Sequence, residues 1–445
     1  MDRRKFLKSA GLATMGALAA PYILPSGRLF AASGIRKVNH VVFCLYAGGV
    51  RNLESVEFND GNLMTNLLNG GSSISPDIAP AMDALPASPL TQPLQNFGTL
   101  FKGFRYSEGP TGHYNGHTVA LTGKYVDVDL NLKEHPRRPT IFEYYRKHNS
   151  PQKTALNSWW VANTLGPYPA LNYSSDPAYG PAYGANFISP TSLISQSGID
   201  VLGTPRIFSA AESGAVNGVR DFANKNFNRA FIDGSAGVTN IANESAILQQ
   251  FISDSFANAQ AGLYNDPWGA GTAMNNDMYN VFFAEEIIKQ FKPEMMVVNM
   301  QDVDIGHFDF SSYANNLRKA DFAAAHLWSV IQNTPGMAND TVMIIAPEHG
   351  RNLNTNNTVD AYGRKALDHT APVDLVSGDQ MAREIFCLIV GPPAVVKQGL
   401  VFNSQVGEST EIAPVMANLL GFDTAIPGSN GLTSFNNCGL QAAFY

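Results

Sequence analysis

Four short runs of apolar residues recur along the chain, and each stops at polar, glycine or proline residues. Runs of this length that are continuously apolar, without alternating polarity, are typical of strands buried on both faces of a sheet. We therefore expect buried strands in four segments, which are Val41–Tyr46, Met295–Asp304, Thr341–Gly350 and Ile385–Pro393.

Helical patterns lie between these runs. Residues 278–291 precede the second run, and residues 313–333 separate the second from the third. A strand, a helix and a further strand at this spacing predict a parallel sheet with crossover helices. The expected fold class is α/β, with a mostly parallel central sheet flanked by helices. A length of 445 residues exceeds a single simple core and favours an inserted region or a second domain.

The segment 163–276 differs in character from the rest. It begins rich in proline, glycine, tyrosine and asparagine, and it ends with more glycine and asparagine, while residues 244–256 show a helical pattern. Long loops of this kind usually bind something or decorate the surface. We interpret the segment as a cap inserted over the sheet edge, either a surface for a carbohydrate-bearing substrate or a packed irregular lid.

Composition and charge narrow the function classes. With 44% hydrophobic and 15% charged residues, the chain is typical of a folded protein with a large core. A formal net charge of -7 leaves no basic surplus to neutralise phosphates, which argues against broad nucleic-acid binding. Small ligands and neutral polymers remain possible binding partners. Cys44 and Cys387 lie inside apolar runs, where we expect structural thiols.

The first 33 residues carry a targeting pattern. Arg3 and Arg4 precede a weakly apolar, Ala/Gly-rich segment, which is typical of a twin-arginine export signal. A transmembrane anchor is less favoured, because the run Gly11–Leu24 falls short of the roughly 20 residues that a span needs. We expect the twin-arginine translocase to export the folded protein to the periplasm or the exterior.

Candidate metal ligands gather near the ends of the predicted strands. Functional groups collect beyond the carboxyl ends of parallel strands, and carboxylate oxygens and imidazole nitrogens suit a divalent metal. Five of the nine histidines fall in such groups, so we expect one shared site. The groups are Asp302, Asp304 and His307; Glu348 and His349; Asp368 and His369; and His113 and His117.

The order of these groups resembles that of the alkaline phosphatase superfamily, which includes sulfatases, nucleotide pyrophosphatases and cofactor-independent phosphoglycerate mutases. "PTGHYNGHTVALTGKY", from Pro110, looks like its nucleophile-bearing segment, and "DVDIGH" looks like its metal-binding Asp-x-x-Gly-His segment. "APEHGR" resembles its Asp-His-Gly strand end, with Glu348 in place of the aspartate, and His369 falls where the last metal histidine is expected. The tail "GESTEIAPVMANLLGF" resembles its closing helix. The resemblance implies one such domain over 34–445, with 163–276 as its cap.

Two features depart from the superfamily pattern. The first strand ends in "CLYAGGVRN", with no carboxylate before Glu54 where a metal-binding aspartate is usual. His113 stands ten residues before Gly123, where active members carry a hydroxyl or a modified cysteine. Both departures also occur in a little-studied sulfatase-like branch, often twin-arginine-exported. Its motifs read roughly Gly-Gly, Ser-His-Phe, Ser-Glu-Phe-Gly-Arg and Asp-His-Gly, and "LYAGG", "GHY", "PEHGR" and "LDH" resemble these in order.

The resemblance implies an exported metal-dependent hydrolase, or a group transferase, acting on a phosphate or sulfate ester of a small molecule or glycan. One or two divalent ions are expected, with zinc, manganese and calcium not distinguished. The implied ligands are Asp304, His307 and His369 for one ion, with Asp302 as an alternative, and Glu348, His349 and His113 for a second.

The attacking group is open at this level. A metal-bound water, the Thr111 hydroxyl and the His113 imidazole are the candidates. We rank the water first, because His113 is better suited to binding a metal. Arg351 would pair with the ester oxyanion, and His117 would support a ligand or act as general acid. The alternative is a non-catalytic exported binding or structural protein that retains a degenerate fold of this type, which the missing aspartate and hydroxyl favour.

Overall fold

The computed structural model describes most of the chain. The predicted export segment 1–33 and much of the predicted cap lie outside the described residues. Those residues are 35–126, 135–148, 154–162, 171–190, 242–271, 274–369, 379–422 and 432–445.

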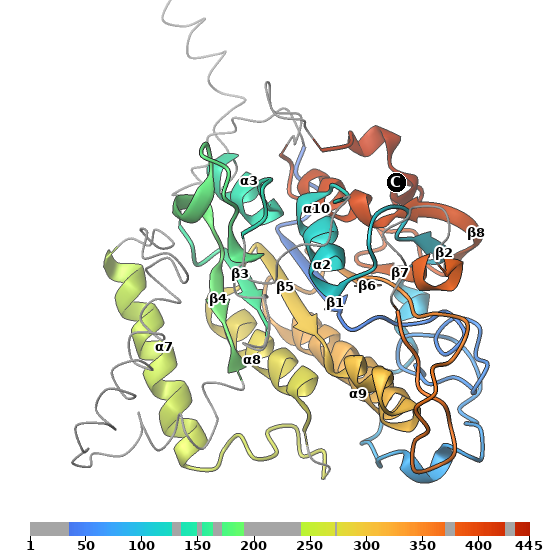
Figure 1. The fold of residues 1–445 in the computed structure, drawn as a ribbon. Helices are drawn as coiled ribbons and strands as arrows, with labels where there is room; N and C mark the ends of the chain where they lie inside the picture. Colours follow the sequence, from blue (N-terminus) through green and yellow to red (C-terminus); the bar gives the residue numbers. More distant parts are fainter. Residues whose placement is uncertain are drawn as a thin grey trace, which may run out of the picture.

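A mixed sheet forms the centre of the described part of the chain (Figure 1). Its eight strands are ordered β4-β3-β5-β1-β6-β7-β2-β8, and the first five are parallel to one another. β7 runs antiparallel to β6 and β2, and β8 is parallel to β2. The strands are β1 (His40–Tyr46), β2 (Gly98–Arg105), β3 (Ser158–Val161), β4 (Asn186–Ile188), β5 (Met295–Met300), β6 (Thr341–Pro347), β7 (Glu384–Val390) and β8 (Leu400–Glu408).

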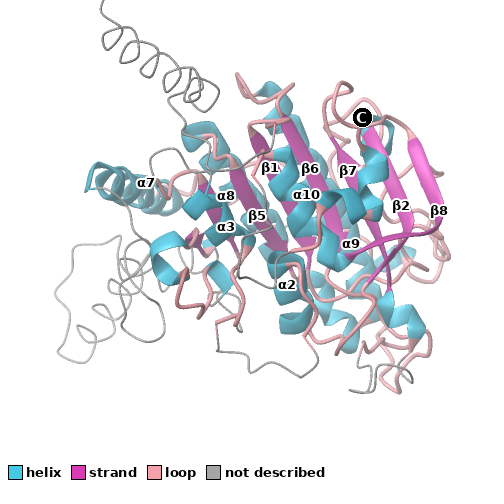
Figure 2. Cartoon of the chain, turned by 90° about the horizontal axis from the view of Figure 1, so that it is seen from above, coloured by secondary structure: helices cyan, strands magenta, loops and turns pink. Residues whose placement is uncertain are grey.

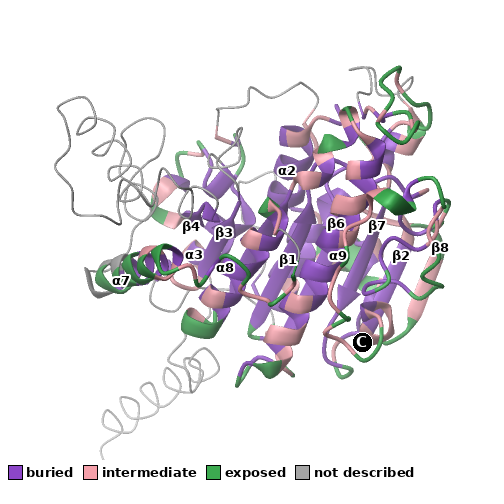
Figure 3. Ribbon diagram, turned by 90° about the horizontal axis from the view of Figure 1, so that it is seen from below, coloured by how far each residue is buried: buried purple, intermediate pink, exposed green. Residues whose placement is uncertain are grey.

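Helices cover both faces of this sheet, so the predicted α/β class is confirmed (Figure 2). On β1, Val42 and Cys44 pack toward the α8 and α9 side, whereas Val41 and Phe43 pack toward the α2 and α10 side. Figure 3 shows the resulting buried interior. The helices are α2 (His113–Thr122), α3 (Ile141–His148), α7 (Ala242–Gln260), α8 (Asn276–Phe291), α9 (Phe310–Asn333) and α10 (Ile412–Leu419).

Short 3-10 helices join many of these elements. They are η2 (Ala79–Ala81), η3 (Leu94–Phe97), η5 (Gly180–Tyr183), η6 (Asp302–His307), η7 (Gln380–Arg383), η8 (Ser409–Glu411), η9 (Phe435–Asn437) and η10 (Gly439–Ala443). No helix of the described residues combines the length and the apolar character needed to cross a membrane.

The second predicted strand is shorter than its apolar run suggested. It stops at Met300 because the buried Asp277 carboxylate accepts hydrogen bonds from the Gln301 amide at 2.6 Å and the Asp302 amide at 3.1 Å. These bonds bend the chain into η6, which carries the first group of candidate ligands. The fourth predicted strand, β7, exists but runs against its neighbours, which the sheet prediction did not anticipate.

Part of the predicted cap belongs to the sheet itself. Residues 186–188 form the edge strand β4, which pairs with β3. The helix expected over 244–256 is present as α7, beside that edge in Figure 1. The boundaries of a cap over 163–276 stay a prediction.

The aspartate Asp321 on α9 anchors the segment between β1 and β2 to the helix layer. Its carboxylate accepts from the amide nitrogens of Asn66 at 3.0 Å and Leu67 at 2.8 Å, and from the Asn66 side chain at 2.7 Å. Burial raises the pKa of Asp321 to about 7, well above its ordinary value of 3.8. Protonation of this group therefore favours the folded state.

We predict that Asp321 makes stability depend on pH in one direction. Its contribution is complete below about pH 4, because the unfolded carboxyl is then protonated too, and it is lost as the pH rises through about 7. Denaturant unfolding of wild type and Asp321→Asn between pH 4 and 8 checks this. The stability of wild type relative to the variant should fall across that range by a few kcal/mol, at roughly 1.4 kcal/mol per pKa unit. A difference that stays constant with pH would contradict the prediction.

Candidate metal centre

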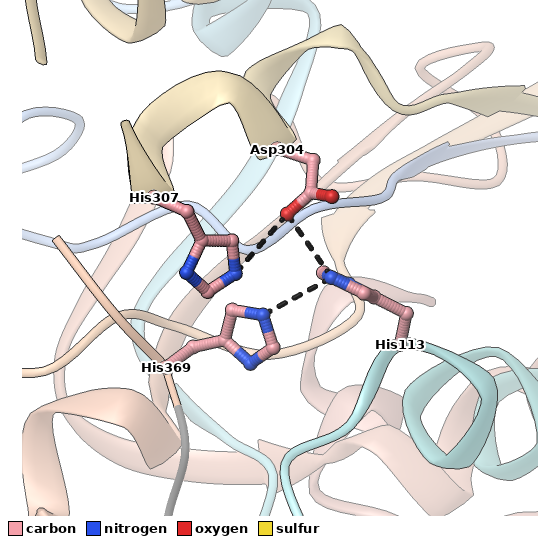
Figure 4. Close-up of side chains that lie close together, drawn as sticks. All are labelled: His113, Asp304, His307 and His369. Atoms are coloured by element: carbon pink, nitrogen blue, oxygen red, sulfur yellow. Dashed lines mark hydrogen bonds and ion pairs between the residues drawn. The ribbon is translucent and has the colours of Figure 1, made fainter. Parts of the chain in front are cut away.

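Three segments bring histidine and acidic side chains together at the edge of the sheet where the parallel strands end. Asp304 and His307 come from η6 after β5, and His113 is the first residue of α2. His369 lies in the segment between β6 and η7 (Figure 4). The nitrogen and oxygen atoms that these four residues offer all lie within 4.8 Å of one another.

The contacts within this group join atoms that a metal would use. Asp304 Oδ1 lies 3.0 Å from His113 Nε2 and 3.4 Å from His307 Nε2. His369 Nε2 lies 3.0 Å from His113 Nε2. Two imidazole nitrogens at that distance must share a proton or a cation, since neutral lone pairs repel each other.

Hydrogen bonds behind the rings fix which nitrogen faces the cluster. His307 Nδ1 contacts the Asp368 carboxylate at 2.8 Å, and His369 Nδ1 contacts the Thr111 carbonyl oxygen at 2.8 Å. Carboxylate and carbonyl oxygens only accept, so the Nδ1 atom of each ring donates and its Nε2 keeps the lone pair. This is how metal-binding histidines are usually oriented.

A second group, His113, Glu348 and His349, lies directly beside the first. His349 is fully buried, and its Nδ1 donates to the Gly350 carbonyl oxygen at 2.8 Å. Its Nε2 has no hydrogen-bond partner and lies 3.3 Å from Glu348 Oε1. A buried lone pair aimed at a carboxylate is unfavourable unless a cation lies between them. The side chains present therefore fit a divalent metal with mixed nitrogen and oxygen ligation.

Burial and the local charges shift the pKa values of neighbouring histidines in opposite directions. Burial opposes protonation of His113, but Glu348 and Asp304 outweigh it and raise the pKa of His113 to about 10. Burial lowers the pKa of His349 to about 4. Burial, with the charges of His349 and His113, also holds the pKa of His369 well below its ordinary value. The cluster thus favours one positive charge, centred between the carboxylates.

A glycine pair follows β1, at the position where the sequence resemblance predicts a carboxylate. Gly48 and Gly49 have φ values of 95° and 80°. A Cβ atom on Gly48 would lie 2.6 Å from the backbone nitrogen of Asp304, and one on Gly49 would lie 2.7 Å from His349 Nδ1. The Gly48 amide donates to Glu348 Oε1 at 2.5 Å. Any side chain here would push the ligands apart.

Asp302, expected as an alternative ligand, joins neither group. Its carboxylate accepts from the Asn276 side chain at 2.8 Å and from the Asp277 amide at 3.2 Å. Burial raises the pKa of Asp302. The 3-10 turn sends Asp302 toward the start of α8 while Asp304 faces the histidines, so the two acids of "DVDIGH" are separated.

Arg351 does not face a substrate position. Its side chain is fully buried, and each of its three nitrogens donates a hydrogen bond within the protein. Arg351 therefore joins separate segments of the chain rather than binding a substrate oxyanion, the role predicted for it. Its acceptors are the carbonyl oxygens of Gly49 at 3.0 Å, Leu367 at 2.6 Å, Val303 at 3.0 Å and Gly48, and Asp304 Oδ1 at 3.3 Å.

Thr111 and His117 lie behind the ligands. The Thr111 hydroxyl is 1% exposed and donates to the His369 carbonyl oxygen at 2.5 Å, so in this conformation it positions that histidine. His117 is fully buried, with Nε2 at 2.8 Å from the Asn299 side-chain oxygen and Nδ1 in contact with the Glu348 carboxylate. Neither side chain is exposed to an incoming ester.

A cleft of about 460 Å³ opens beside Asp304, whose side chain is 44% exposed. The groups around it are mostly neutral amides and apolar side chains, of which Phe308 is 68% exposed. The lining residues are Asn275, Asn276, Gln301, Asp302, Asp304, Ile305, Phe308 and Asn316.

Sequence reasoning gave no role to several residues that orient the ligands. Asp368 was grouped with His369 but not assigned to the His307 ring, and Asn356 donates to both Asp368 Oδ1 at 3.1 Å and the His307 carbonyl oxygen at 3.0 Å. The adjacency of Asp368 and His369 in "LDH" is the one signal that could have indicated this. Asn299, at the end of β5, carries no such signal.

No protein-family model and no curated protein matches the sequence. The chain is similar in structure to members of the alkaline phosphatase superfamily. A superfamily protein from Vibrio parahaemolyticus is 12% identical with a TM-score of 0.46, covering 95% of this chain and 74% of that one. Wild-type alkaline phosphatase PafA is 10% identical with a TM-score of 0.46, covering 90% and 100%. A 2-O GAG sulfatase is 9% identical with a TM-score of 0.43, covering 90% and 74%. Likenesses at this level establish no activity for this chain.

We predict that Gly48→Ala damages the centre through steric contact with Asp304. The matched control is Gly363→Ala, because Gly363 has a φ of 84° but no atom within 4 Å of an added Cβ. The control should lose only the about 1–2 kcal/mol of a left-handed alanine, whereas Gly48→Ala should lose at least about 1 kcal/mol more from overpacking. Denaturant unfolding measures both, and divalent-metal affinity should fall only in Gly48→Ala. Equal losses in the two variants would show that the contact with Asp304 is unimportant.

Proposed function

We propose that this protein is a metal-dependent hydrolase, or group transferase, acting on a phosphate or sulfate ester. The observation that carries the proposal is the convergence of His307 Nε2 and His369 Nε2, oriented by hydrogen bonds from behind, on Asp304 and His113. The motif order that resembles the alkaline phosphatase superfamily supports the same chemistry. Asp304, His307, His369 and His113 would hold one ion, and Glu348, His349 and His113 would hold or approach a second.

When bound, a divalent ion supplies a Lewis acid that neutralises oxyanion charge and makes water a better nucleophile at neutral pH. The protein's own residues orient and insulate this centre. Asp368 and the Thr111 carbonyl hold two rings in place, and Arg351 ties the strand ends together. Because the Thr111 hydroxyl is donated to a carbonyl and His113 faces two carboxylates, we favour water over a side chain as the attacking group.

The cleft beside Asp304 supports a place for the organic part of the ester. It opens beside Asp304, and its amide and apolar lining residues suit an uncharged group with hydroxyls and an apolar face. The ester oxygen would then approach Asp304 from the cleft, while Phe308 offers an exposed ring for stacking. Substrate choice would rest on these amides rather than on charge.

A non-catalytic metal-binding protein is the second candidate. The buried, donated hydroxyl of Thr111 favours it, because the nucleophile segment then presents no free hydroxyl to the cluster. The two candidates agree on the metal and differ on turnover, so they are separated by activity of the metal-loaded protein.

We predict stoichiometric divalent metal in protein purified without chelators and its loss in His307→Ala. His148→Ala is the control, because His148 contacts Tyr179 and belongs to neither ligand group. Elemental analysis measures the metal, and chromogenic phosphate monoesters, phosphate diesters and sulfate esters measure turnover, which should fall at least about 100-fold in His307→Ala. Wild type without metal would refute the proposal. Metal without turnover on any ester would favour the non-catalytic candidate.

Export by the twin-arginine translocase to the periplasm or the exterior is also part of the proposal. It rests on Arg3 and Arg4 and the segment behind them, which lie outside the described residues. We predict that the variant with both arginines replaced by lysine stays in the cytoplasmic fraction, whereas wild type is exported from it. Immunodetection in cell fractions checks this, and equal distribution of both proteins would refute it.

A further inference from the structure

A second buried arginine, Arg383, differs from Arg351 because its side chain has no hydrogen-bond partner among the described residues. Its side chain is 1% exposed, and neither Nε nor Nη1 nor Nη2 has a hydrogen-bond partner. No carboxylate of the described residues forms an ion pair with it. Taking an unpaired guanidinium out of water is costly, and an arginine cannot shed its charge as a lysine can. A partner for this charge is therefore expected.

The surroundings of Arg383 leave its charge uncompensated. Burial lowers the pKa of Arg383, and Tyr106, Tyr125 and the exposed Glu108 only partly offset this effect. Neither phenol oxygen accepts a hydrogen bond from Arg383. The Tyr106 hydroxyl donates to the Pro110 carbonyl oxygen at 2.9 Å, and the Tyr125 oxygen accepts from the Ser107 amide at 2.7 Å. Among the described residues, the Arg383 guanidinium therefore has neither a hydrogen-bonded acceptor nor an ion pair.

Arg383 stands at the same edge of the sheet as the candidate metal centre. It precedes β7, whose amino end lies beside the carboxyl end of β6 because the two strands are antiparallel. The Ala382 carbonyl oxygen accepts from the Gly350 amide at 2.7 Å, and the Arg383 carbonyl oxygen accepts from the Tyr106 amide at 2.9 Å. Arg383 therefore lies between the strand end that carries His349 and the loop that leads to α2.

We infer that Arg383 is an oxyanion-binding residue that takes a phosphate or sulfate group. The planar guanidinium has five donors arranged to hold two oxygens of one tetrahedral oxyanion, and all three of its nitrogens are available. Its burial limits the ligand to a small anion or to the terminal oxyanion of a larger molecule. This site uses none of the metal-cluster side chains, so it does not depend on the proposed function.

The test compares Arg383→Met with wild type by thermal unfolding in chloride and in sulfate or phosphate at equal ionic strength. In chloride the variant should be at least as stable as wild type, because an uncompensated buried charge has been replaced by an apolar chain of similar length. In sulfate or phosphate wild type should gain a saturable rise in Tm of about 2 °C or more that the variant lacks. Arg383→Lys, which keeps the charge but loses the planar fork, should keep only part of the rise.

Arg351→Met is the matched control for losing a buried arginine. It should lower Tm in every buffer, because it strands the carbonyl oxygens that Arg351 now serves. If Arg383→Met also lowers Tm in chloride, the guanidinium has a partner within the chain and the inference fails. Identical anion responses in wild type and Arg383→Met would overturn it as well.

A variant of the metal cluster separates this inference from the proposed function. The saturable anion response should persist in His307→Ala, and its loss there would assign the anion to the cluster and overturn the inference. Phenyl phosphate then distinguishes two sources of the same chemistry. A response equal to that of inorganic phosphate supports a site for the terminal oxyanion of a larger molecule, and a response to inorganic phosphate alone supports a free-ion site.

Discussion

Nitrogen lone pairs face one another at the centre of this protein, and the arrangement holds only if positive charge lies between them. His113 Nε2 and His369 Nε2 are 3.0 Å apart, with Asp304 Oδ1 equally close to His113. A proton on His113, whose pKa rises to about 10, meets that need, and a divalent ion would meet it more fully because it accepts several lone pairs at once. Much of the surrounding structure serves to hold these rings in a mutual orientation that they would not adopt unaided.

Two structural features hold the histidine rings in this orientation. The backbone of Gly48 and Gly49 passes so close to Asp304 and His349 that it fills the space where a side chain would stand. Arg351 then binds carbonyl oxygens from three separate stretches of chain, fixing the ends of β1 and β5 relative to the loop that leads to His369. The carboxylate that related folds are expected to carry after the first strand has been exchanged here for close backbone packing, with Glu348 accepting from the Gly48 amide.

The parts of this fold that the sequence predicted are those with strong local patterns. Apolar runs predicted β1, β5, β6 and β7, and the motif order predicted most of the side chains that lie together at one sheet edge, with Asp302 as the exception. The direction of β7 was missed because an apolar run carries no polarity, and β8 was missed because its centre is exposed and reads as a loop. Arg351 and Arg383 look alike in the sequence. Only the positions of surrounding carbonyl oxygens, which depend on the tertiary fold, decide that Arg351 joins chain segments while the Arg383 side chain has no partner among the described residues.

The hydrogen bonds that orient the histidines come from Asp368, the Thr111 carbonyl and the Gly350 carbonyl, and none of them needs an ion. Thr111 and His369 also hold each other in place. The Thr111 hydroxyl donates to the His369 carbonyl oxygen, and the His369 ring donates to the Thr111 carbonyl oxygen. A centre supported in this way is shaped by folding itself, so binding of the proposed ion would cost little further ordering entropy and its removal by a chelator would not unfold the chain. Under the proposed metal binding and export, loading would depend on the ions that surround the finished protein, so the compartment in which it resides, rather than the one in which it folds, would select the metal.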